Sequence, residues 1–181
     1  MLNSTLLGLM IGISGVAYCA DPNGQVFAQV GAYNETGQGG VTAVQVGGGA
    51  EYMLLSRVGV FAEFNYIPAS NASSGGSAVS GDVILAGAGV RMFANPRGKF
   101  VRVYVPVIGG IAHATASRHS FFGGDDFSVS ANGSYFGIGL GTEIGSKRFG
   151  ARPEVRYFRE LVKNGRDGNA ITAMCGLYFR F

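Results

Sequence analysis

Apolar residues occupy every second position in eight segments of the chain. In the last segment, Leu177, Phe179 and Phe181 share one phase, and Tyr178 and Arg180 occupy the other. A period of two places successive side chains on opposite faces of a β-strand. The pattern therefore predicts eight strands, at residues 25–33, 42–53, 58–67, 82–93, 101–113, 134–144, 149–161 and 171–181.

Charged residues fall in only one of the two phases of these strands, apart from Arg159 near a strand end. The uncharged phase is continuously apolar, whereas the other phase is rich in glycine and mixes acidic with basic side chains. A soluble barrel would bury its apolar face, but a membrane barrel turns that face to lipid and keeps a polar interior. The charged phase contains Glu51, Glu63, Glu143, Glu154, Glu160, Arg91, Arg102, Arg152, Arg156 and Arg180.

The connections between the predicted strands alternate in length. Those after the second, fourth and sixth strands are short (LLSR, NPRGK and SKR), and those after the other strands are longer. Short periplasmic turns that alternate with long outer loops are typical of outer-membrane barrels. The sequence therefore predicts an all-β protein, an eight-stranded antiparallel transmembrane β-barrel with both of its ends on the periplasmic side.

The composition agrees with one small membrane barrel. The chain has 181 residues, of which 31 are glycine and only 14% are charged, well below the roughly 25% of soluble domains. After the first twenty residues no apolar run approaches the ~20 residues of a spanning helix. The net charge of +3 is small and scattered, which argues against a nucleic-acid partner.

The N-terminus has the pattern of a secretory signal. Residues 6–17 form an apolar stretch too short to span a membrane, and small residues follow it. We expect a signal peptide over residues 1–19 and the barrel domain over residues 20–181. The alternatives are a lipid-modified Cys19, disfavoured by Tyr18 before it, and a buried N-terminal helix. Cleavage after Cys19 leaves Cys175 alone, a small apolar filler with no disulfide partner.

Two segments resemble a known family. The segment SYFGIGLGTEIGSKRFGARPEVRYF (residues 134–158) resembles the hairpin of the sixth and seventh strands in OmpA- and OmpX-like barrels. The segment VRVYVPVIGGIAH resembles the fifth strand of the same family, with the usual Pro-Tyr-Val order altered. The resemblance implies the architecture of a small outer-membrane barrel but no particular activity. It also implies that the final strand, through Phe181, Phe179 and Leu177, is the signal that the barrel-assembly machinery recognises.

The interior of an eight-stranded barrel is just wide enough for side chains, so charges inside it must pair. We therefore predict a lumen plugged by Glu/Arg salt bridges, with Leu85, Ile108 and Phe61 filling space beside them. The alternative is a narrow passive pore, but the mixed signs leave no single-charge ring of the kind that selective pores use. We also expect lumen glycines to tolerate serine at little cost. The predicted network is Glu51, Glu63, Arg91, Arg102, Glu143, Arg152, Glu154 and Arg156.

A hydrolase site is the third possibility. His113, Thr115 and Ser117 share one face near the outer end of the fifth predicted strand, and His119 and Ser120 follow. A lipid-modifying hydrolase could use a histidine base and a serine nucleophile there. However, the His-x-Ser-Asn arrangement of outer-membrane deacylases is absent, and we find no carboxylate in the right phase. We therefore expect no catalytic residues and no enzyme activity.

The longest connection contains a candidate contact surface. Asp125 and Asp126 could bind a divalent cation, but two adjacent carboxylates are a weak ligand set, and we expect no metal or cofactor. Phe121, Phe122 and Phe127 beside them are apolar residues of the kind that mark contact surfaces, unless they fold onto the barrel rim.

These observations favour a structural or surface-interaction role in the outer membrane of a Gram-negative-type bacterium, which the chain reaches through the periplasm. The expected partners are outer-membrane lipids and lipopolysaccharide, together with the barrel-assembly machinery and periplasmic chaperones during biogenesis. We expect a monomer.

Overall fold

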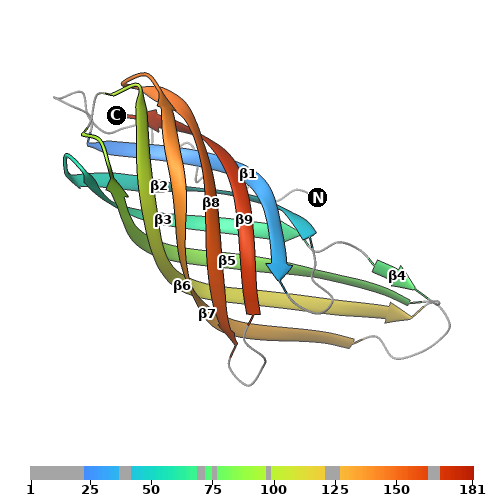
Figure 1. The fold of residues 1–181 in the computed structure, drawn as a ribbon. Coiled ribbons are helices and arrows are strands. Elements are labelled where there is room, and N and C mark those ends of the chain that lie inside the picture. Colours follow the sequence, from blue (N-terminus) through green and yellow to red (C-terminus); the bar gives the residue numbers. More distant parts are fainter. Residues whose placement is uncertain are drawn as a thin grey trace.

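The computed structural model describes residues 23–36, 42–68, 72–74, 77–96, 99–120, 127–162 and 168–181. For residues 72–74, 77–80, 116–120, 127, 129 and 162 it describes the backbone alone. The strands are β1 (Gly24–Thr36), β2 (Thr42–Leu55), β3 (Val58–Pro68), β4 (Ala72–Ser74), β5 (Ser77–Phe93), β6 (Val101–Ser120), β7 (Phe127–Gly145), β8 (Phe149–Val162) and β9 (Gly168–Arg180) (Figure 1).

All strands except the short β4 join one closed barrel. Neighbouring strands pair antiparallel, and β1 pairs with β9 from Gln25 opposite Arg180 to Thr36 opposite Asn169. The pairing of β3 with β5 completes the ring and leaves β4 outside it, as a hairpin partner of β5. Closure matters because an unpaired backbone group in hydrocarbon costs several kcal/mol. The structure confirms the predicted eight-stranded antiparallel barrel.

The two ends of the barrel differ. We call one the turn end, because it contains the short connections 56–57, 94–100 and 146–148 together with Gly24 and Phe181. The opposite end, where β1 leads to β2 and β6 to β7, is the loop end. At the turn end the backbone NH of Phe181 donates to the carbonyl of Gly24 (3.0 Å), and the NH of Gly24 donates to the carbonyl of Phe181 (3.3 Å). Pairing of the first and last strands therefore continues to the final residue.

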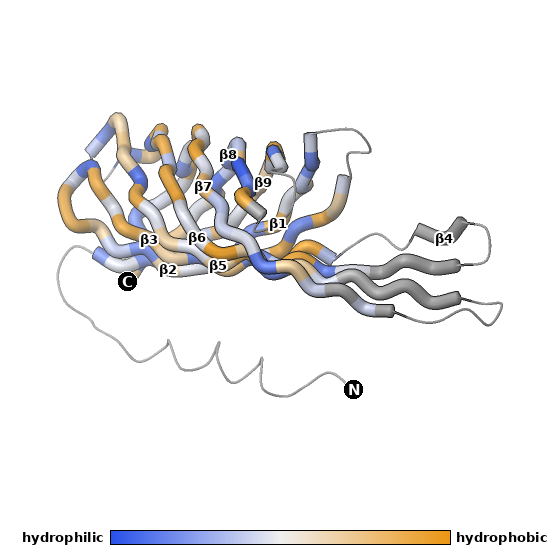
Figure 2. The backbone as a smooth tube through the Cα atoms, turned by 90° about the horizontal axis from the view of Figure 1, so that it is seen from below, coloured by the Kyte–Doolittle hydropathy of each residue, from blue (hydrophilic) through white to orange (hydrophobic). Residues whose placement is uncertain are grey.

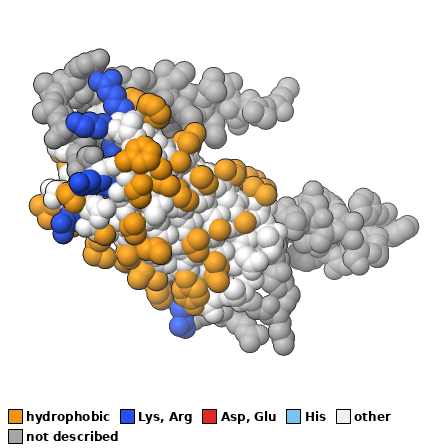
Figure 3. Space-filling view, turned by 45° about the horizontal axis from the view of Figure 1, so that its top comes forward, with side chains coloured by type: hydrophobic (Ala, Val, Ile, Leu, Met, Phe, Trp, Pro, Cys, Tyr) orange, Lys and Arg blue, Asp and Glu red, His pale blue; other side chains and the backbone are white. Residues whose placement is uncertain are grey.

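The outward face is apolar, as its phase predicted. Hydropathy alternates along the strands in Figure 2, and apolar side chains cover the wall of the barrel in Figure 3. Exposed outward residues include Val30, Val44, Phe64, Val90, Val103, Ile138, Val155 and Leu177. No helix among the described residues is long and apolar enough to cross a membrane.

Aromatic side chains mark the limit of this apolar belt at the turn end, and polar side chains mark its limit towards the loop end. At the turn end the exposed aromatic residues are Tyr52, Phe100, Phe149, Phe179 and Phe181. Towards the loop end, outward polar side chains bond across strand pairs: Asn34–Thr42 (2.9 Å), Tyr66–Asp82 (2.8 Å), His113–Asn132 (2.6 Å) and Tyr157–Asn169 (2.7 Å). Between these limits, Phe179 and Ile171 of β9 are separated by about 27 Å at ~3.4 Å per residue. Strand tilt reduces that length to roughly 20 Å, close to the ~25 Å apolar band of membrane barrels.

Three strands are longer at the loop end than the sequence predicted. β5 begins at Ser77, β6 continues to Ser120, and β7 begins at Phe127, so the prediction of a long loop over residues 114–133 was wrong. Ser77 lies opposite Ser120 and Arg118 lies opposite Phe127. The small and polar residues here satisfy their backbone groups by pairing with each other. As a result β5, β6 and β7 form a three-stranded sheet that projects beyond the barrel (Figure 1).

Candidate functional site

The centre of the lumen contains a network of buried charges. The guanidinium of Arg156 binds both carboxylate oxygens of Glu63, one of them at 2.8 Å, and its Nε donates to Glu154. Arg91 donates to Glu51 and also lies 3.8 Å from Glu63 and 3.9 Å from Glu154. The side chains of these residues are at most 2% exposed. Because each carboxylate has more than one partner, the removal of any one of these side chains deprives more than one buried charge of a partner.

A second group of charges lies closer to the turn end. The guanidinium groups of Arg102 (3.1 Å) and Arg180 (2.5 Å) both bind one oxygen of Glu143. Gln25 connects the two groups, because its amide donates to Glu51 (2.8 Å) and to Glu143 (2.9 Å). Its carbonyl oxygen accepts a hydrogen bond from Arg180 (3.0 Å). The charges therefore form one continuous network.

Aromatic rings cover the faces of the lumen arginines. An arginine can bind carboxylates with its edge and stack on an aromatic ring with its face, and such contacts are favourable when they are desolvated. Arg152 uses both, since it lies 3.5 Å from Glu51 and over the ring of Phe27. Distances from guanidinium carbon to ring centroid are 3.6 Å for Arg102–Phe93, 3.7 Å for Arg152–Phe27, 3.8 Å for Arg91–Phe61, 4.5 Å for Arg180–Tyr178 and 5.6 Å for Arg156–Phe61.

Apolar layers fill the lumen on both sides of the charges. The layer nearer the loop end consists of Tyr33, Phe61, Ile67, Leu85, Ile108, Tyr135, Phe158 and Ala170. At the turn end Met53, Phe93 and Tyr104 form a smaller cluster. The hydroxyl of Tyr104 donates to Glu154 (2.6 Å), which ties this cluster to the network. The lumen is therefore plugged along its length. Of its apolar residues, only Phe61, Leu85 and Ile108 were predicted from the sequence.

Lumen glycines make room for these large side chains. Each of the following glycines lies directly opposite a bulky residue on the adjacent strand: Gly49 opposite Phe27, Gly89 opposite Phe61, Gly141 opposite Tyr104, Gly137 opposite Phe158 and Gly139 opposite Arg156. A Cβ atom at Gly49 would lie 2.7 Å from the Phe27 ring, and one at Gly141 would lie 2.4 Å from the Tyr104 ring. The expectation that lumen glycines tolerate serine was therefore wrong.

The structure brings all eight residues of the predicted lumen network together. Arg180 and Glu160 also belong to the charged phase of the predicted strands. Arg180 joins the network, but Glu160 lies apart towards the loop end, where it accepts a hydrogen bond from Tyr33 (2.7 Å). Gln25 was not predicted from the sequence, although it shares the inward phase of β1 with Phe27 and Gln29. That phase could have identified both Gln25 and Phe27.

Two of the possible hydrolase residues, His113 and Thr115, lie on the outward face at the loop end. His113 is exposed, and its ring contacts the amide oxygen of Asn132 (2.6 Å). A carboxylate does occur in this phase, contrary to the sequence analysis, because Asp82 lies opposite the exposed Thr115. However, Asp82 accepts a hydrogen bond from Tyr66. The described geometry thus shows no contact between a histidine and an orienting carboxylate at this place.

Several predicted features lie outside the described residues. They are the signal peptide at residues 1–19, the connection that contains Phe121, Phe122, Asp125 and Asp126, the side chain of Phe127, and the side chains of Ser117, His119 and Ser120. In the part of the chain that the structure describes, no group of three or more His, Cys, Asp or Glu side chains could hold a metal ion. Cys175 is exposed on the outward face.

No protein-family model matches the sequence, and no curated protein matches it at a significant level. Solved structures do match. Neisserial surface protein A superposes with a TM-score of 0.71 at 13% identity, over 88% of this chain and 97% of that one. Ail, the attachment invasion locus protein of Yersinia pestis, gives a TM-score of 0.65 at 18% identity, over 90% of this chain and 100% of that one. The N-terminal β-barrel domain of Pseudomonas aeruginosa OprF gives 0.51 at 19% identity, over 87% and 99%. The chain therefore has the fold of the small eight-stranded outer-membrane β-barrels.

Proposed function

We propose that this chain is an integral outer-membrane β-barrel with a structural or surface-interaction role and without enzyme or channel activity. The observation that carries this proposal is the combination of an apolar outer belt with a lumen filled by paired charges and aromatic rings. The belt suits hydrocarbon, and the filled lumen leaves the wall of the barrel and its ends as the surfaces available for contact.

The orientation follows from the connections. Short turns face the periplasm in outer-membrane barrels, and longer connections face the outside of the cell. The turn end is therefore placed in the periplasm and the loop end at the cell surface. Outer-membrane lipids and lipopolysaccharide are then the immediate surroundings of the monomer.

The projecting sheet of β5, β6 and β7 supports a surface-interaction role. It extends the barrel at the loop end and leads to the connection with the candidate contact residues Phe121, Phe122, Asp125 and Asp126. Two of the structural neighbours are described as a surface protein and an attachment protein. Ail has also been solved in complex with sucrose octasulfate, a heparin analogue. We propose a comparable kind of role, contact at the cell surface, for the loop end of this chain.

Biogenesis requires further partners. We propose that periplasmic chaperones and the barrel-assembly machinery receive the unfolded chain, and that Leu177, Phe179 and Phe181 form the recognised signal. Support comes from their position, because all three are exposed on the outward face of β9 or just beyond it.

Two measurements test the proposed function. First, the protein in isolated outer membranes should change its mobility on gels when it is boiled, because a folded barrel resists detergent at room temperature. Second, the purified barrel in planar bilayers should give no discrete conductance steps, whereas a known porin under the same conditions should. Absence of the protein from the outer-membrane fraction would contradict the membrane assignment. Reproducible single-channel steps would instead favour the narrow-pore alternative.

A further inference from the structure

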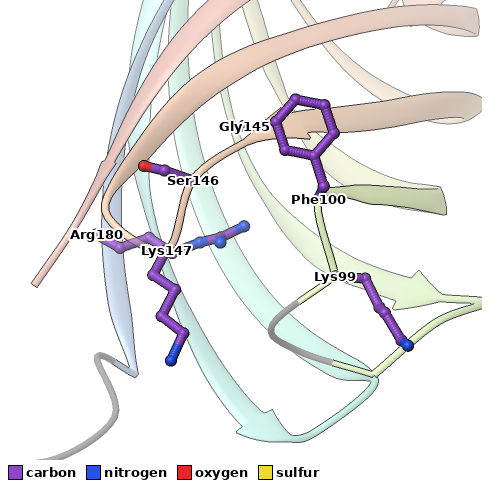
Figure 4. Close-up of a pocket in the computed structure, with 6 residues that line it drawn as sticks. All are labelled: Lys99, Phe100, Gly145, Ser146, Lys147 and Arg180. Atoms are coloured by element: carbon purple, nitrogen blue, oxygen red, sulfur yellow. The ribbon is translucent and has the colours of Figure 1, made fainter.

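A pocket opens at the turn end between two of the short connections. It has a volume of about 200 Å³ and is lined by Lys99, Phe100, Gly145, Ser146, Lys147 and Arg180 (Figure 4). Pockets for drug-sized ligands usually occupy ~300–1,000 Å³. This pocket is therefore suited to a small group, such as one headgroup.

The lining of the pocket is positively charged. In Figure 4 the side chains of Lys99 and Lys147 come from different connections, and both extend away from the guanidinium of Arg180. Arg180 is only 6% exposed and is fixed by Glu143 and Gln25. Glu143 also binds Arg102, so two guanidinium groups share one carboxylate beneath the pocket. The positive charge at the floor is therefore only partly compensated.

The surrounding rim adds further positive charge. Arg57 and Arg148 are exposed at the same end, and most of the Lys and Arg side chains visible in Figure 3 lie there. The carboxylate side chains of the described residues lie elsewhere. They are in the lumen (Glu51, Glu63, Glu143, Glu154 and Glu160) or at the loop end (Glu35 and Asp82). Among the side-chain carboxylates of the described residues, only Glu143 lies close to this rim, where it binds Arg180 and Arg102 from beneath the pocket.

The pocket also adjoins the apolar belt. Phe100 forms one wall and is exposed, and the outward residues that follow the two connections, Val101 and Phe149, are exposed as well. Ser146 shapes the second connection, because its hydroxyl oxygen accepts hydrogen bonds from the backbone NH groups of Arg148 (3.3 Å) and Phe149 (3.1 Å). A cationic site thus lies within a residue or two of a surface that suits acyl chains.

We propose that this pocket binds the phosphate group of an anionic glycerophospholipid in the periplasmic leaflet. The proposal rests on the orientation given under the proposed function. Lys99 and Lys147 turn their flexible side chains towards the pocket and donate to the unesterified phosphate oxygens, and Arg180 supplies a fixed positive charge at the floor. The acyl chains lie along the belt near Val101 and Phe149. The positive charge of the pocket favours such a lipid over a neutral lipid, and the apolar contact favours it over a free anion.

The test uses the folded, full-length barrel in neutral detergent and native mass spectrometry. Phosphatidylglycerol should bind more tightly than phosphatidylcholine with the same acyl chains. Each Lys near an anionic lipid surface contributes ~1 kcal/mol, which corresponds to roughly fivefold in affinity. Lys147→Gln should therefore weaken phosphatidylglycerol binding about fivefold, and the double variant Lys99→Gln/Lys147→Gln about thirtyfold. Heat-modifiable mobility of each variant shows that it is folded.

The matched control is Arg57→Gln, which removes one positive charge from the same end but outside the pocket. It should leave phosphatidylglycerol binding unchanged. An equal loss for Arg57→Gln and Lys147→Gln would overturn the proposal in favour of a diffuse charged rim. Displacement of the lipid by an equal concentration of inorganic phosphate would contradict the proposal that the bound phosphate group belongs to a lipid, and would indicate a site for free phosphate. A barrel that inserts into outer membranes but does not prefer phosphatidylglycerol would refute this proposal alone, whereas failure to insert would refute the proposed function.

Discussion

Gly137 of β7 lies directly opposite Phe158 of β8, and a Cβ atom on Gly137 would lie 2.6 Å from Cδ1 of the Phe158 ring. The ring is 1% exposed and packs edge-on against Tyr135. It therefore has little room to move away. Alternation of glycine with bulky residues between neighbouring strands is what allows aromatic rings and arginines to fill so narrow a barrel.

Gly137→Ala should lower the free energy of unfolding by about 1–3 kcal/mol, the usual cost of overpacking. The matched control is Gly109→Ala. Apart from the residues next to it in the chain, the atom nearest to a Cβ on Gly109 would be the carbonyl oxygen of Tyr135, at 3.8 Å. That change should stay within about 0.5 kcal/mol. Urea unfolding of the barrels in lipid vesicles measures both.

Phe158→Leu should restore part of the stability that Gly137→Ala removes, because the smaller side chain leaves space for the new methyl group. Equal stabilities of the two alanine variants would mean that the register of β7 and β8 differs from the one described.

Reversal of one network charge should destabilise the barrel strongly. Glu63→Arg places a third cation beside Arg91 and Arg156 in a water-excluded lumen, and breaking a buried pair costs about 3–5 kcal/mol. Adding Arg156→Glu should recover only part of this loss. The new acid would lie beside Glu154, and the new arginine would still lie beside Arg91. The free energies of the two single variants and the double variant form a mutant cycle, and an additive result would show that Glu63 and Arg156 do not interact.

The loss of stability caused by an arginine on the outward face should depend on the depth of that position in the membrane. Ile138 is 52% exposed in the middle of the belt, where Ile138→Arg should cost ~2–4 kcal/mol. Leu161 faces outward four residues beyond Tyr157, near the limit of the belt, so Leu161→Arg should cost only ~0–1 kcal/mol. Unfolding in vesicles provides the comparison. Similar costs at the two positions would argue against an apolar environment around the barrel.

The direction of each strand side chain could be predicted because the alternation persists along the chain. Arg156 faces inward and Ile138 outward for that reason alone. The contacts that each inward side chain makes across the lumen could not be predicted in the same way. Glu51 of β2 meets Arg91 of β5 and Arg152 of β8 across the lumen, and these strands are not neighbours of β2. Such contacts depend on the stagger and curvature of the closed sheet, which the period of the pattern does not specify.

The limits of the strands at the loop end were also missed for a physical reason. Residues 114–117 and 128–132 alternate weakly and in the reverse sense, with alanine or valine in the phase of the charged residues and hydroxyl or amide side chains in the phase of the apolar belt. Hydropathy marks where hydrocarbon ends, whereas strand pairing continues as long as backbone groups have partners. Hence β6 and β7 extend beyond the apolar belt. The pairing of glycines with aromatic rings on neighbouring strands could not be predicted either, because it depends on the register between those strands.

The final prediction concerns Phe181. Its backbone bonds to Gly24 do not depend on its side chain, and its ring is 37% exposed at the turn end. Phe181→Ala should therefore change the unfolding free energy of the refolded barrel by less than about 1 kcal/mol. The same variant should sharply reduce the heat-modifiable fraction in outer membranes of expressing cells, because the assembly machinery would lose the aromatic residue that we propose it recognises.

Arg180→Ala is the control for Phe181→Ala, since it changes the neighbouring residue but keeps the aromatic one. Arg102 and Gln25 still compensate Glu143 in that variant, so the network survives in part. Its heat-modifiable fraction should fall much less than that of Phe181→Ala. If Phe181→Ala instead assembled at the wild-type rate, Phe181 would be only a member of the aromatic rim, and recognition would have to depend on Leu177, Phe179 or another part of β9.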